Sequence, residues 1–73
     1  MRDNFIKAMI KKYEAEIDVA KATLDVYLDK SVGIGEHPQF ATEIDKQLEI
    51  IGCATDKLRV IEKHYPSDDD IPF

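Results

Sequence analysis

Apolar residues recur along the first half of the chain in steps that alternate between four and three. Steps of this kind place every member on one face of an α-helix, and here they continue for three heptads, as in a coiled coil. Asp3 or Asn4 supplies a short side-chain acceptor for the first free N–H groups. The pattern therefore predicts a helix over residues 3–29. Its apolar face consists of Ile6, Ile10, Tyr13, Ile17, Ala20, Leu24 and Tyr27.

A second apolar pattern begins after Pro38, which suits the first position of a helix because its missing N–H would have no partner there. Pro66 stops the segment, so the pattern predicts a helix over residues 38–64. Two consecutive steps of three, at Ile51 and Ala54, predict a locally overwound coiled coil. Gly52 is expected to let the helices approach closely, at about 1 kcal/mol of helix propensity. The predicted face consists of Ala41, Ile44, Leu48, Ile51, Ala54, Leu58, Ile61 and Tyr65.

The connection between these helices, residues 30–37, contains two of the three glycines and predicts a loop. Similar helix lengths and a short connection predict an antiparallel hairpin, so the expected fold is all-α and coiled-coil-like over residues 1–65. A chain this short builds only a small core. We therefore expect the hairpin to self-associate, as a homodimer or higher oligomer, in a helical bundle. Further apolar residues widen the two faces, at Met9, Val26, Leu28, Ile50, Cys53 and Val60.

Composition argues against several classes of function. Cys53 is the only cysteine, so it forms no intrachain disulfide, and it does not form a zinc spacing with the two histidines. The sequence has no run of eighteen apolar residues and no signal peptide, which predicts a cytoplasmic protein without a membrane span. No catalytic triad is apparent, and so short a chain hardly encloses a catalytic pocket. We expect a protein that is not an enzyme and that needs no cofactor or metal.

Negative charge is concentrated near the C-terminal end. The chain has 15 acidic and 10 basic residues, for a formal charge of −5. Three of the acids stand in a row at residues 68–70, and without them the balance is 12 acids to 10 bases. A surface that tracks phosphates needs clustered lysine and arginine. Direct binding of nucleic acid is therefore not expected.

Residues 66–73 form a separate C-terminal segment. Pro66, Pro72 and the run of aspartates oppose a helix, so the sequence predicts a disordered tail. An acidic end commonly keeps a small protein in solution, but that role does not explain the apolar residues Ile71 and Phe73. A terminal carboxylate beside an apolar anchor is typical of a ligand for another protein.

The tail resembles the C-terminal tip of bacterial single-stranded DNA-binding protein. The match is residue for residue and in register with the chain end, over Asp68, Asp69, Asp70, Ile71, Pro72 and Phe73. In that family the tip docks on RecQ-type helicase, exonuclease I, the primosomal helicase and the chi subunit of the clamp loader. The resemblance implies that Phe73 fills an apolar pocket and that its α-carboxylate pairs with a basic residue. It also implies that Ile71 packs beside Phe73, that Pro72 sets the turn, and that the aspartates follow a basic ridge.

The resemblance ends at the tail, because nothing in residues 1–65 is similar to the OB barrel of that family. The sequence thus predicts a non-enzymatic interaction protein that displays a mimic of the tip. Such a protein would bind, block or retarget the host proteins that recognise the tip. The glycine-containing loop resembles small helical-hairpin proteins of tailed phages, which implies the cytoplasm of a bacterial host.

Two other functions stay open on the sequence alone. The first is a sponge for a nucleotide signal, because the loop precedes a helix N-terminus, which attracts anions. An ordinary turn is the simpler interpretation, since Glu36 repels anions and the loop is not a P-loop. The second is a structural assembly factor with an incidental tail. The residues of the possible nucleotide site are Lys30, Gly33, Gly35 and His37.

Overall fold

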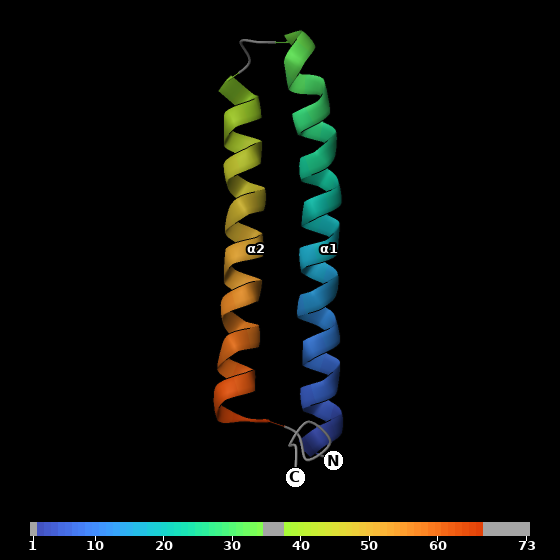
Figure 1. The fold of residues 1–73 in the computed structure, drawn as a ribbon, viewed down its shortest axis with the longest axis vertical. Coiled ribbons are helices and arrows are strands. Elements are labelled where there is room, and N and C mark those ends of the chain that lie inside the picture. Colours follow the sequence, from blue (N-terminus) through green and yellow to red (C-terminus); the bar gives the residue numbers. More distant parts are fainter. Residues whose placement is uncertain (1, 35–37, 67–73) are drawn as a thin grey trace.

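The computed structural model describes residues 2–34 and 38–66. Almost all of them belong to two α-helices, α1 (Arg2–Ile34) and α2 (Pro38–His64). The helices lie side by side and run in opposite directions, in a molecule with principal dimensions of 52 × 22 × 15 Å (Figure 1). The predicted all-α antiparallel hairpin is confirmed, and α2 has the bounds that the sequence predicted.

Helix α1 continues further than predicted. The sequence analysis ended it at residue 29 and assigned residues 30–37 to a loop, whereas the backbone stays helical through Ile34. That prediction was wrong because it took the glycines as stop signals. Gly33 lowers helix propensity by about 1 kcal/mol but keeps its N–H, whereas proline removes the hydrogen bond altogether. The rest of the predicted loop, residues 35–37, lies outside the described residues.

The interhelical face of α1 is the one that the sequence predicted. All seven predicted residues are buried or half-buried, and Ala20 keeps only 1% of its surface exposed. This agreement is expected, because an uninterrupted alternation of four and three keeps successive residues pointing at a neighbouring helix.

The interhelical face of α2 differs from the prediction at three positions. Ala41, Leu48 and Tyr65 are exposed, and Leu48 leaves 52% of its surface in solvent. The residues preceding two of them, Phe40 and Gln47, are half-buried instead. The observed face consists of Phe40, Ile44, Gln47, Ile51, Ala54, Leu58 and Ile61.

This corrected face alternates steps of four and three without interruption, so its register contains no overwound stretch at Ile51 and Ala54. Leu48 was chosen for its hydropathy, but it lies about 100° around the helix from Gln47. The helical period therefore decides which residue faces α1, even though that residue is polar. Gly52 is exposed, and a Cβ built on it would meet nothing within 4 Å, so the expected close approach at Gly52 was wrong.

The core between the helices is small. Among the described residues, the buried hydrophobic side chains are Ala20 and Ala54, each 1% exposed, and no large side chain is fully buried. Near the connection, Tyr27 meets Phe40 edge to face, with ring centroids 5.5 Å apart. Much of the apolar surface of the hairpin is therefore left in contact with water.

Candidate interaction surfaces

The residues predicted to bind partner proteins follow the end of α2. The helical hydrogen bonding extends to Tyr65, whose N–H donates to the carbonyl of Ile61 over 2.8 Å. Pro66 is exposed and is the last residue that the structure describes. The six predicted partner-binding residues lie beyond it, outside the described residues, and their roles stay predictions. They are Asp68, Asp69, Asp70, Ile71, Pro72 and Phe73.

The possible nucleotide site at the connection lies only partly within the described residues. Lys30 and Gly33 belong to the last turns of α1 rather than to a loop. Gly35 and His37 lie outside the described residues. Tyr27, near the end of α1, packs against Phe40 across the hairpin. No contact that the structure describes therefore favours a nucleotide at this end of the molecule.

Besides the interhelical faces, the hairpin has two broad faces, and one of them is apolar. On α1, Phe5, Val19 and Val26 are separated by multiples of seven residues, so they lie along one line of the helix. Phe5 is 71% exposed and Val19 is 66% exposed. We call this surface the apolar face and define it as Phe5, Met9, Val19, Val26, Ile50 and Val60.

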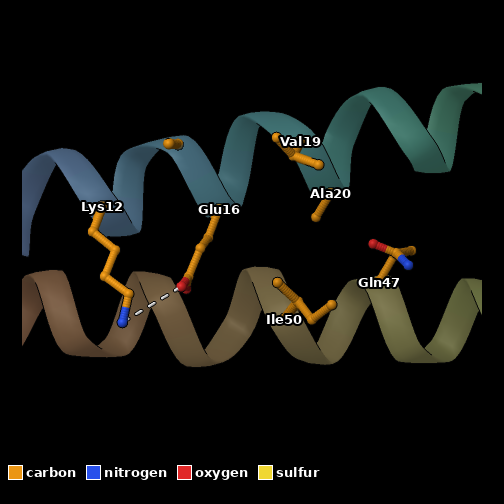
Figure 2. A pocket seen from close by; sticks show the side chains of 7 residues that line it. Lys12, Glu16, Val19, Ala20, Gln47 and Ile50 are labelled. Carbon is orange, nitrogen blue, oxygen red and sulfur yellow. Dashed lines mark ion pairs between the residues drawn. The ribbon is translucent and has the colours of Figure 1, made fainter.

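A groove of about 620 Å³ lies in the middle of the apolar face. Figure 2 shows Ala20 pointing toward α2, with Ile50 lining the groove from α2. At one end of the groove, Lys12 Nζ lies 3.9 Å from Glu16 Oε2, and the two side chains are 58% and 41% exposed. An exposed pair of this kind contributes little stability. The lining residues are Lys12, Ala15, Glu16, Val19, Ala20, Gln47 and Ile50.

A second groove, of about 330 Å³, continues the apolar face toward the free ends of the helices. Met9 and Val60 line it from the two helices. Lys57 is its one charged lining residue, and its Nζ lies 5.2 Å from the ring centroid of Tyr13 on the opposite helix. This cation–π contact joins α2 to α1 beside the groove.

The opposite side of the hairpin is charged. Its residues flank the interhelical faces on the side away from Met9 and Val19, and all of them are exposed. Acidic and basic side chains are mixed along α1, so no long stripe of one sign forms. Leu28 and Leu48 also lie on this side. We call this surface the charged face and define it as Lys7, Lys11, Glu14, Asp18, Lys21, Asp25, Asp45, Arg59 and Glu62.

Within residues 2–34 and 38–66, no three His, Cys, Asp or Glu side chains lie where they could hold a metal ion. In the same ranges, neither helix combines the length and the apolar character that crossing a membrane requires.

Comparison with protein-family models, with curated proteins and with solved structures finds no match to this chain.

The sequence analysis did not identify Phe5 and Val19 as surface residues with a possible role. A signal was present, because both share a spacing of seven with Val26. The spacing alone does not say which flank of the helix stays uncovered, since that depends on where α2 lies.

Proposed function

We propose that this protein is a non-enzymatic interaction protein that imitates the C-terminal tip of bacterial single-stranded DNA-binding protein. The proposal depends on one observation, the sequence Asp-Asp-Asp-Ile-Pro-Phe at residues 68–73. In a chain that ends at Phe73, one residue carries both an aromatic side chain and a carboxylate. Both groups are suited to an apolar pocket with a cation at its rim.

The parts of the tail have separate roles in this proposal. Phe73 is the anchor, because a buried aromatic side chain supplies most of the energy of a small interface. Ile71 packs beside it, and Pro72 limits the conformations that must be ordered on binding. The three aspartates act mainly on the rate of encounter and on its salt dependence. A ligand this short binds with a dissociation constant of about 1 μM or weaker, because ordering it costs entropy.

The hairpin is the carrier of the tail. Its charged face mixes both signs, so it offers no stripe of cations that could follow a phosphate backbone. The protein is therefore suited to occupying the tip pocket of a helicase, a nuclease or a replication factor, rather than to bringing that protein to DNA. Its proposed place of action is the bacterial cytoplasm, where it competes with the authentic tip.

A displacement assay tests this proposal. A fluorescent tip peptide is bound to purified exonuclease I or RecQ-type helicase, and the full chain is added while the fluorescence anisotropy is measured. The wild-type chain is expected to displace the peptide. Phe73→Ala is expected to compete about 30-fold more weakly, as for the loss of an anchor worth about 2 kcal/mol.

Leu48→Ala is the matched control, because it removes an apolar side chain that is half exposed on the helical body. This variant is expected to compete as well as the wild-type chain. Equal competition by the wild-type and Phe73→Ala chains would contradict the proposal, and so would an absence of displacement by the wild-type chain.

A further inference from the structure

We propose that the apolar face is the surface through which this chain binds a second copy of itself. Self-association was expected from the small core and from the residues that widen the two apolar stripes, but the sequence did not indicate which flank forms the interface. The inference concerns residues 5–60 of the helical body and does not depend on the proposed role of the tail.

The first argument is the amount of apolar surface that the hairpin leaves uncovered. Its buried hydrophobic residues, among those described, are two alanines, whereas Phe5 and Val19 are each about two-thirds exposed or more. Val60 extends the exposed apolar surface onto α2. Two helices are half of a four-helix bundle, in which the second pair of helices covers such a face.

The area of the apolar face is also close to that of a stable protein interface. The hairpin is 22 Å wide, and α2 has 27 residues, which gives it a length of about 40 Å. The face therefore offers on the order of 900 Å², close to the roughly 800 Å² that each partner contributes to a stable interface. Residues 67–73 span at most about 23 Å when extended, so the tail of the same chain could cover only part of it.

The spacing of residues on the apolar face fits a two-fold symmetric pairing of two copies. A two-fold interface brings residue i of one copy to residue j of the other, and j to i. On α1, Met9 and Val19 are both centred on position 14, and so are Lys12 and Glu16. On α2, Ile50 and Val60 are centred on position 55. The Tyr27–Phe40 contact places position 14 level with position 53, so positions 14 and 55 lie within about 3 Å of one level.

A single two-fold axis at this level therefore brings the two members of each pair together across the interface. In this arrangement α1 of one copy runs antiparallel to α1 of the other. Met9 then faces Val19, and Ile50 faces Val60. Lys12 of each copy lies beside Glu16 of the other, which makes the charges complementary. The alternative, with α1 over the second copy's α2, would bring Lys12 near Lys57, two like charges. Pairing through the charged face would bury many ions at a large desolvation cost.

The molar mass of the full chain, measured by sedimentation equilibrium at 10–200 μM, tests this inference. The wild-type chain is expected to sediment as a dimer. Val19→Lys is expected to sediment at the monomer mass of 8.3 kDa with unchanged helical circular dichroism, because Val19 is mostly exposed in the hairpin. Leu48→Lys, the same change on the opposite side, is the matched control and is expected to remain dimeric.

A charge exchange tests the register. Lys12→Glu is expected to weaken the dimer at least threefold, because it sets two acids together, and Lys12→Glu with Glu16→Lys is expected to restore it. A monomeric wild-type chain would overturn the inference. The inference would also be overturned if Leu48→Lys dissociated the dimer and Val19→Lys did not. A dimer that forms only after residues 67–73 are removed would overturn it as well, because the tail would then occupy the apolar face. A Phe73→Ala chain that stays dimeric but no longer displaces the tip peptide separates this inference from the proposed function.

Discussion

The helical body and the C-terminal tail encode information in different ways. In the body, mostly apolar residues recur at steps of four and three. The fourteen positions of the two interhelical faces that result define one antiparallel arrangement. In the tail, three aspartates share one role in the proposed recognition, and Ile71, Pro72 and Phe73 each have a role of their own. Because the pattern is repeated, one misassigned position, as at Leu48, did not prevent a correct prediction of the fold. A single change at Phe73 is expected to weaken binding strongly, because no other residue of the tail repeats its role.

The largest expected effect tests whether the two parts act separately. Ala20→Asp places an unpaired charge at a position that is 1% exposed, which costs about 3–5 kcal/mol. This is comparable to the whole stability of so small a core, so the helical circular dichroism signal is expected to be lost. The tail of this variant is nevertheless expected to displace the tip peptide as well as the wild-type chain does at the same molar concentration.

Ala22→Asp is the control for this experiment, because Ala22 is exposed on the same helix. It is expected to stay folded and to compete normally. Loss of displacement by Ala20→Asp would show that recognition needs the folded hairpin, and the separation of body and tail would be wrong.

A smaller effect is expected from moving the carboxylate without changing a side chain. Adding one glycine after Phe73 keeps the aromatic ring but places the charge one residue further on. Competition in the anisotropy assay is expected to weaken at least tenfold, because the hydrogen bonds to the carboxylate depend on its position. The thermal midpoint is expected to stay unchanged. Undiminished competition would mean that the ring alone is recognised.

The interhelical face of α1 could be predicted in full because hydropathy and helical period agree at every position from Ile6 to Tyr27. On α2 they disagree, and the polar Gln47 lies at the interhelical face while Leu48 is exposed. The end of α1 was missed because a glycine weakens a helix without ending it. The sequence marks Met9, Val26, Ile50 and Val60 as widening the two stripes, but it does not say which flank stays uncovered, since that depends on where α2 lies.

A still smaller effect is expected from the aspartates of the tail. Replacing Asp68, Asp69 and Asp70 together with asparagine removes three charges and keeps the side-chain shape. The association rate is expected to fall several-fold at low salt and to become nearly independent of ionic strength, because steering by charge is screened by salt. Stopped-flow fluorescence measures this rate. An unchanged salt dependence would show that the charges do not face a basic surface.

The smallest expected effect concerns the body alone. Gly52→Ala adds a methyl group where nothing lies within 4 Å and improves helix propensity, so the free energy of unfolding is expected to rise by up to about 1 kcal/mol. Urea denaturation followed by circular dichroism measures the change. Displacement of the tip peptide should not change. Destabilisation would mean that a close neighbour, such as a second copy, covers Gly52.

The claim that the tail occupies the same pocket as the authentic tip is tested most directly by calorimetry. Exonuclease I is titrated with the full chain, first alone and then after saturation with the tip peptide of single-stranded DNA-binding protein. The account predicts binding of one tail per pocket in the first titration and a large loss of apparent affinity in the second. Equal heat and equal affinity in both titrations would contradict it.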